Sequence, residues 1–313
     1  MTIPSILAAT WSDGLFVFEG DARRQELAGR SVRDLAPGQN GSVLAIVDGH
    51  ALCRRTREGV WSTLATSQPA LASVIVVGDA IYLGTDDARV LRVDQRGAID
   101  PLNGFGTIAG RDTWYAGSAV INGQRVGPPL GVRSMTATVE GSVLLVNVHV
   151  GGVPRSTDGG VTWQPTIDVR SDVHEVCAHP LYPHTVIAAA AIGLCISRDG
   201  GATWIVENEG LPSPYCSAVA FSQGDILVAA STGHFADQGA VYRRPIDGTG
   251  PLQPVRGLPR WLGGIVDTGC IATRGRAVAV ADKAGNLYAS ADAEDAWLHR
   301  DDGLPMVSKV LLI

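Results

Sequence analysis

Short apolar runs that recur about every 45 residues constrain the fold of this chain more than any other feature. Each run is rich in Ala and β-branched residues, and each is followed by a turn and a second strand-like segment. The seven runs occupy residues 5–10, 42–47, 80–85, 142–147, 185–190, 225–230 and 276–281. Continuous apolar runs bounded by Gly, Asp and Pro are typical of strands that are covered on both faces. Their spacing is the period of a four-stranded propeller blade.

The best-formed unit defines the register of a blade, with its four strands at residues 173–178, 185–191, 193–197 and 204–207. Applied to the whole chain, this register makes the N-terminus begin at a second strand and leaves residues 307–313 as an inner strand without a blade. Pairing these two ends completes a seventh blade and removes an exposed sheet edge. We therefore predict an all-β, seven-bladed β-propeller with four-stranded antiparallel blades, closed by residues 307–313. Residues 1–313 are expected to form a single domain.

Two octapeptides, 156–163 and 197–204, are nearly identical: Ser-Thr-Asp-Gly-Gly-Val-Thr-Trp and Ser-Arg-Asp-Gly-Gly-Ala-Thr-Trp. Their aspartates, Asp158 and Asp199, lie 41 residues apart, the length of one blade. The shared pattern S-x-D-x-G-x-T-W resembles the Asp-box, or BNR, repeat of sialidase-like, sortilin-type and photosystem-assembly-factor propellers. A short carboxylate in such a turn accepts backbone N–H groups of the same turn, and the Trp fills the gap between neighbouring sheets. The resemblance likewise implies that the two aspartates are structural and not catalytic.

The composition excludes several classes of protein. A formal net charge of −6 and a pI near 5.6 argue against a nucleic-acid binder with a basic surface. No apolar run reaches the roughly 18 residues of a membrane span, and no basic head precedes the short apolar stretch at the N-terminus. Five cysteines without a C-x-x-C pair are typical of reduced thiols. We expect a cytoplasmic protein that binds neither nucleic acid nor membrane.

In the predicted register, the inner strands begin on the same face as the turns between second and third strands. Side chains at these positions would line the mouth of the central funnel, and four of the seven histidines map to it: His50, His149, His174 and His234. Imidazoles that converge with carboxylates hold a divalent metal or act as general acid and base. We predict these four histidines as metal ligands, the cofactor being otherwise unspecified. The predicted catalytic group is His149, Asp172, His174 and Glu175. The alternative to a metal or catalytic site is that each of these histidines caps a turn or faces solvent.

One blade departs from the period, because about 30 residues precede its inner strand where other blades need about 8. We predict that residues 104–131 form an insertion loop on the funnel face. Loops of this length inside a compact domain are usually functional or disordered, and this one carries an arginine and aromatic side chains suited to sugars or carboxylates. The predicted ligand-binding residues are Arg111, Trp114, Tyr115, Arg133, Tyr215 and Asp267. The remaining histidines, His179, His184 and His299, are predicted to lie on the surface.

Three functions follow from this interpretation. The first is a small-molecule binding or catalytic site at the funnel mouth, assisted by a metal, with substrate and reaction open. The second is a non-catalytic scaffold that docks a protein, which resemblance to the photosystem-assembly factors implies. The third is a sialidase-like glycoside hydrolase, with a glycan as ligand. Against the third, the Arg-Ile-Pro signature of sialidases is missing, and Arg111, Arg125 and Arg133 come from one blade junction, whereas sialidases use separate blades.

Overall fold

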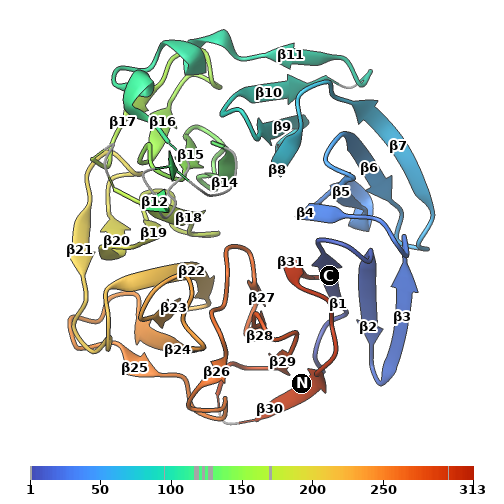
Figure 1. Cartoon of the computed structure of the whole chain (residues 1–313), viewed down its shortest axis with the longest axis vertical. Helices are drawn as coiled ribbons and strands as arrows, with labels where there is room; N and C mark the ends of the chain where they lie inside the picture. Colours follow the sequence, from blue (N-terminus) through green and yellow to red (C-terminus); the bar gives the residue numbers. More distant parts are fainter. Residues whose placement is uncertain are drawn as a thin grey trace.

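The computed structural model is a ring of β-sheets around a central axis (Figure 1). The structure describes residues 2–94, 96–115, 120–121, 124–125, 130–168, 171–294 and 296–313. These residues form seven blades of four antiparallel strands, one of which carries a fifth, short strand. The seven-bladed β-propeller predicted from the sequence is therefore confirmed.

The strands of each blade follow one another from the axis to the rim (Figure 1). Blade 1 contains β31 (Val307–Leu312), β1 (Ile6–Thr10), β2 (Leu15–Glu19) and β3 (Ala22–Glu26). Blade 2 contains β4 (Val32–Pro37), β5 (Val43–Val47), β6 (Ala51–Arg55) and β7 (Trp61–Thr66). Blade 3 contains β8 (Leu71–Val77), β9 (Ala80–Thr85), β10 (Val90–Val93) and β11 (Ile99–Pro101). Blade 4 contains β14 (Val132–Ala137), β15 (Leu144–Val148), β16 (Pro154–Ser156) and β17 (Gln164–Pro165).

The second half of the ring has the same order. Blade 5 contains β18 (Val173–Ala178), β19 (Val186–Ala190), β20 (Gly193–Ser197) and β21 (Ile205–Glu207). Blade 6 contains β22 (Tyr215–Ser222), β23 (Asp225–Ser231), β24 (Gln238–Pro245) and β25 (Gln253–Pro254), with β26 (Leu262–Gly263) beside β24. Blade 7 contains β27 (Ile271–Arg274), β28 (Ala277–Ala281), β29 (Leu287–Ser290) and β30 (Trp297–Asp301).

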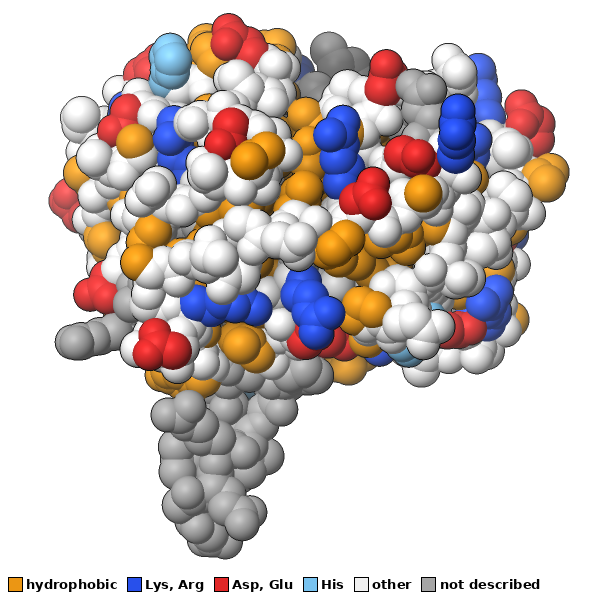
Figure 2. All heavy atoms as spheres, turned by 90° about the horizontal axis from the view of Figure 1, so that it is seen from above, with side chains coloured by type: hydrophobic (Ala, Val, Ile, Leu, Met, Phe, Trp, Pro, Cys, Tyr) orange, Lys and Arg blue, Asp and Glu red, His pale blue; other side chains and the backbone are white. Residues whose placement is uncertain are grey.

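The remaining described elements are short. They are the 3-10 helices η1 (Gln39–Gly41), η2 (Asn103–Thr107) and η3 (Arg111–Thr113), and the paired strands β12 (Val120–Ile121) and β13 (Gln124–Arg125). No helix in the described part of the chain is long and apolar enough to span a membrane. In the side view of Figure 2, Lys and Arg side chains are interspersed with Asp and Glu, as the small net charge predicts.

The ring closes between the first and last strands of the described chain. β31 pairs with β1 in antiparallel register, with Ile6 opposite Leu312 and Ala8 opposite Val310. This pairing supplies the inner strand of blade 1 and confirms the closure predicted from the sequence. Every residue of β5, β19 and β28 is buried, because second strands are covered by the adjoining blades on both faces.

A β-bulge recurs near the start of six inner strands. The bulged residues are Arg33, Ala72, Arg133, His174, Ser217 and Ser308. A bulge re-aims one side chain while the rest of the strand keeps its alternation. Two of the predicted site residues, Arg133 and His174, occupy this position, so the bulge contributes to where their side chains point.

Side chains at or just after the bulges link neighbouring inner strands. Asp34 accepts the backbone N–H of Val74 at 2.8 Å, and Ser134 accepts that of Val176 at 3.0 Å. Ser73 donates to the carbonyl of Val132 at 2.8 Å, and Ser217 to that of Val266 at 2.6 Å. We call the side chains of Asp34, Ser73, Ser134 and Ser217, together with those of Glu175, Ser308 and Lys309, the polar belt. The belt ties the blades together around the axis.

The two Asp-box turns have the internal hydrogen bonds that the motif predicts. Asp158 accepts the N–H of Thr162 at 2.9 Å and its hydroxyl at 2.6 Å, and Ser156 donates to Asp158 at 2.8 Å. Asp199 makes the corresponding contacts in the next blade. Because Thr162 donates to Asp158, the pKa of that carboxyl falls to about 2. Both carboxylates are thus engaged in their own turns.

His179 is buried, and its predicted surface position is wrong. Its ring stacks on Tyr182 and meets Phe221 edge-on, with centroids 4.3 and 4.6 Å away. Its Nδ1 accepts the backbone N–H groups of Leu181 and Tyr182, both at 3.0 Å. His179 directly follows the inner strand β18, and no sequence feature indicated that it caps the turn before β19. His184 and His299 are exposed, as predicted.

Acid is expected to destabilise the protein through His179. Burial lowers the pKa of His179, so below about pH 6.5 the unfolded chain takes up a proton that the folded chain resists, and stability falls as the pH falls. Between pH 7.5 and 5.5, wild type should lose about 1 kcal/mol more stability than His179→Gln in urea unfolding. His184→Gln serves as the exposed control and should keep the wild-type pH dependence. Equal pH dependence of wild type and His179→Gln would contradict this assignment.

Candidate functional site

Two histidines and an aspartate meet at the mouth of the central funnel. His149 follows β15, Asp172 precedes β18, and His174 is the bulged residue of β18. The backbone holds them together, because the N–H of Val173 donates to the carbonyl of His149 at 2.8 Å. Asp172 also forms a β-bridge with Val150. Two blades that are adjacent in the ring therefore fix all three side chains.

The three side chains converge on one carboxylate oxygen. Asp172 Oδ1 lies 2.9 Å from His149 Nε2 and 3.3 Å from His174 Nε2. His149 and His174 are 6% and 2% exposed. The His174 Nδ1 donates to the carbonyl of Cys216, so in the neutral imidazole Nε2 carries the lone pair. Asp172 Oδ1 and His174 Nε2 nevertheless have no directed hydrogen bond.

Electrostatics favour a neutral His149 beside an ionised Asp172 near neutral pH. Burial, foremost, lowers the pKa of His149, and the nearby charge of Arg133 adds to this. Burial by itself would raise the pKa of Asp172, but its interactions with His149 and His174 outweigh burial and lower it below the usual range. A divalent metal requires these protonation states of an imidazole and a carboxylate ligand.

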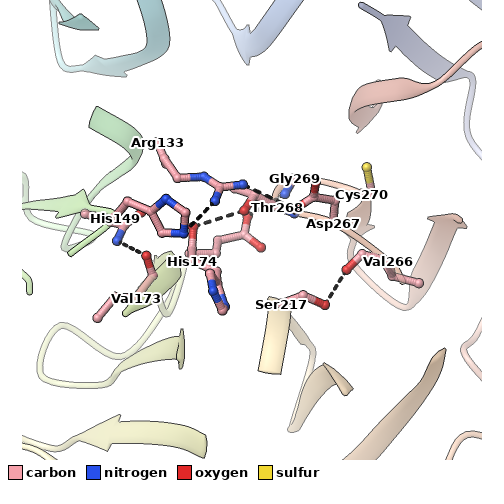
Figure 3. Close-up of polar contacts among 12 residues, drawn as sticks. Arg133, His149, Val173, His174, Ser217, Val266, Asp267, Thr268, Gly269 and Cys270 are labelled. Atoms are coloured by element: carbon pink, nitrogen blue, oxygen red, sulfur yellow. Dashed lines mark hydrogen bonds and ion pairs between the residues drawn. The ribbon is translucent and has the colours of Figure 1, made fainter. Parts of the chain in front are cut away.

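Arg133 and Asp267 extend the cluster across the mouth (Figure 3). Arg133 NH1 lies 3.1 Å from His149 Nε2, and NH2 lies 3.3 Å from Asp267 Oδ1. The ring of Tyr215 packs on His174 with centroids 4.7 Å apart. Burial, then the negative charge of Asp172, raises the pKa of Tyr215, so its hydroxyl stays protonated. These three predicted ligand-binding residues lie around the histidine cluster.

Glu175 does not join the cluster, although it follows His174 directly in the sequence. Its Oε2 accepts the N–H of Val219 at 3.0 Å and its Oε1 that of Gly269 at 3.1 Å. The side chain lines a cavity of about 790 Å³ along the axis, together with Asp34 and Lys309. Burial raises the pKa of Glu175 to about 7. These contacts make Glu175 a member of the polar belt. The bulge at His174 points the side chains of His174 and Glu175 in different directions.

In the described part of the insertion, Trp114 and Arg111 pack against each other. Trp114 is 6% exposed and packs against Phe105, while the Arg111 guanidinium covers its ring at 4.8 Å and donates to the Ala88 carbonyl at 2.7 Å. Trp114 thus lies in the core with the half-buried Arg111 over its ring, and the two do not form the open aromatic platform expected from the sequence. Apolar burial at a blade junction accounts for this.

The insertion also reaches the histidine cluster through its backbone. Tyr115 and Val150 exchange two backbone hydrogen bonds of 3.1 Å, and a Cβ on Gly151 would lie 3.0 Å from the Trp114 ring. Residues 148–152, which carry His149, therefore rest on Trp114 and Tyr115. Of the predicted 104–131 loop, residues 116–119, 122–123 and 126–129, and the Arg125 side chain, lie outside the described residues.

The other two predicted metal ligands lie apart from the cluster. His50 is exposed, and its Nδ1 contacts the carbonyl of Ser67 at 3.1 Å. His234 is exposed beside Phe235, with ring centroids 4.8 Å apart. Among the described residues, His149, Asp172 and His174 form the only group of three or more His, Cys, Asp or Glu side chains whose donor atoms all lie within 4.8 Å of one another.

Sequence reasoning missed Asp34 and Lys309 as members of the polar belt, and it placed Asn147 only among the turn residues at the mouth. Asn147 is fully buried and donates to the Val173 carbonyl at 2.6 Å, which fixes the start of β18. Lys309 Nζ lies 3.3 Å from Asp34 Oδ1. A polar pair near the start of an otherwise apolar inner strand, as in Arg33-Asp34 of β4 and Ser308-Lys309 of β31, was the available signal.

The chain is similar to solved β-propellers at low sequence identity. A candidate 6-phosphogluconolactonase from Bacteroides uniformis matches with a TM-score of 0.68 and 13% identity, over 100% of both chains. A GH74 enzyme from Niastella koreensis matches with 0.59 and 15% identity, over 94% of this chain and 46% of its own. An ancestral GH74 enzyme matches with 0.63 and 13% identity, over 99% and 40%. This chain thus spans less than half of either GH74 enzyme. No protein-family model and no curated protein matches it.

Proposed function

We propose that the funnel mouth is a small-molecule binding or catalytic site organised around a divalent metal held by His149, Asp172 and His174. The observation that carries this proposal is the convergence of three donor atoms within 4.8 Å, two of them without a directed hydrogen bond. Buried polar atoms without partners are costly, and a bound cation would satisfy them together.

The donor set suits a transition metal such as Zn²⁺. Two imidazoles and one carboxylate are its common ligands, and three protein ligands leave a position open for a ligand or water. The bond from His174 Nδ1 to the Cys216 carbonyl is the outer contact that usually orients a ligating imidazole. When bound, the metal would polarise a ligand oxygen or lower the pKa of a bound water.

The wider assignments rest on separate observations. The two Asp-box turns support a place among the BNR/Asp-box propellers, with residues 1–313 as one domain. Five unpaired cysteines support a reducing, cytoplasmic environment. A sialidase-like hydrolase receives no support from the described side chains, because Arg111 is engaged with Trp114 and Ala88 and so does not join Arg133 in an arginine cluster at the mouth. The GH74 and lactonase-like neighbours leave a glycan or another small molecule as the substrate.

Metal binding by histidine variants tests the proposal. Purified wild type should bind one Zn²⁺ or Co²⁺ per chain, measured by elemental analysis and titration. His149→Ala and His174→Ala should each lose more than about 100-fold in affinity, since even outer contacts of metal ligands contribute 10- to 100-fold. His184→Ala, an exposed histidine elsewhere, should bind as wild type does. A wild type without metal, or variants with unchanged affinity, would exclude the metal site, and the protein-docking scaffold would then be favoured.

A further inference from the structure

We propose that the natural ligand of this mouth carries an oxyanion group that binds beside the metal and is held by Arg133. This inference rests on the proposed function. It narrows the ligand to anions, which neither the histidine cluster nor the propeller fold specifies. The chemistry is that of a carboxylate or a phosphate, and the experiment below separates the two.

Arg133 is poised to change partners when a cation binds. Its NH1 faces His149 Nε2 at 3.1 Å, the same nitrogen that lies nearest Asp172. A metal held by that nitrogen would use its lone pair, and NH1 would then have no acceptor there. The arginine side chain is only 23% exposed, and a guanidinium largely removed from water needs a replacement acceptor.

The remaining partner of Arg133 does not fill that need. Asp267 contacts NH2 at 3.3 Å, a long distance for a charge-assisted bond. The same oxygen, Oδ1, also accepts the N–H of Thr268 at 2.8 Å. With a metal bound, NH1 would therefore have an unused N–H donor beside the metal. An oxyanion could then bind to the metal and to NH1 at the same time.

The charge balance at the mouth favours the same ligand. Lys283 lies near His234, because its Nζ is 5.9 Å from the ring centroid of Phe235, and that ring packs on His234 with centroids 4.8 Å apart. The acids at the mouth are Asp172, 2.9 Å from His149, and Asp267, 3.3 Å from Arg133. A divalent metal would leave the opening with net positive charge, and a ligand oxyanion would offset it. A planar guanidinium matches an oxyanion through paired N–H donors.

Oxyanion titration of the Co²⁺-loaded protein tests the inference. Oxalate and inorganic phosphate are added separately, and binding is followed by the visible spectrum of Co²⁺ and by calorimetry. Wild type should bind at least one of them, and the stronger one identifies the carboxylate or the phosphate class. Arg133→Gln should keep Co²⁺ binding yet lose at least 10-fold in oxyanion affinity, and Arg133→Lys should fall between. Arg33→Gln is the matched control, because Arg33 has the same bulge position in blade 2 and is paired with Asp86 at 2.8 Å.

The outcomes separate the two proposals. If Arg133→Gln binds Co²⁺ and its oxyanion affinity stays within two-fold of wild type, the proposed role of Arg133 is overturned. The metal site is not affected by that result. Co²⁺ binding by wild type without affinity for either oxyanion would also overturn the role of Arg133, leaving the metal site intact. Failure of wild type to bind Co²⁺ would overturn both.

Discussion

Glu175→Gln is expected to lower the free energy of unfolding by about 3 kcal/mol, the upper end for a buried N–H left without its acceptor. Both carboxylate oxygens accept backbone N–H groups, from Val219 and Gly269. Glutamine keeps the shape but turns one acceptor into an NH₂ donor that faces one of these N–H groups. Urea unfolding at about pH 8.5, above the Glu175 pKa of about 7, where the carboxylate is ionised, measures the loss.

A second acidic residue provides the control for this prediction. Glu140 lies at the rim of the same axial cavity but is exposed, so Glu140→Gln should change stability by less than about 0.5 kcal/mol. The folded Glu175→Gln variant should bind metal as wild type does, because Glu175 lies outside the histidine cluster. A loss of stability below about 1 kcal/mol would contradict its role in the polar belt. Loss of metal binding by a folded variant would favour the catalytic role predicted from the sequence.

Trp114→Ala is expected to destabilise the protein by about 3–5 kcal/mol, as other large-to-small changes in cores do. The ring is buried between Phe105 and the Arg111 guanidinium, and it contacts Gly151 near His149. The cavity left behind would remove the support of residues 148–152. Metal affinity should therefore fall in the folded variant together with stability, as measured by urea unfolding and Co²⁺ titration.

Trp204→Ala gives the matched comparison for Trp114. Trp204 is only half-buried, and its Nε1 donates to Thr166 at 3.1 Å, away from the histidine cluster. Trp204→Ala should lower the free energy of unfolding by less than Trp114→Ala does, and it should leave metal affinity unchanged. Equal metal affinities in the two variants would show that the insertion does not support His149.

The repeat made the fold predictable because a propeller blade uses the same local pattern seven times. The apolar runs located the second strands, and residues 307–313 stood out as an inner strand without a blade. The meeting of His149 with Asp172 and His174 was also predictable, because the turn after β15 and the start of β18 lie on one face of adjacent blades.

Other side-chain positions depended on features without a strong sequence signal. Alternation along β18 cannot anticipate the bulge at His174, so Glu175 was expected in the cluster while its carboxylate lies in the axial cavity. Trp114 and Arg111 looked like an exposed binding pair because the insertion has no repeat to align with. In the structure, Arg111 packs on Trp114, and Trp114 packs against Phe105. Such packing contacts leave no pattern in the sequence.

The pairing of β31 with β1 also has a consequence for biosynthesis. During translation, six blades can assemble from contiguous chain, whereas blade 1 waits for Val307–Leu312 to leave the ribosome. Until then β1 presents an unpaired edge, the kind that promotes aggregation, and the interactions of Ser308 and Lys309 with β4 are absent. Contacts between such distant segments form slowly. The edge of β1 is therefore the last sheet edge to be covered while the nascent chain folds.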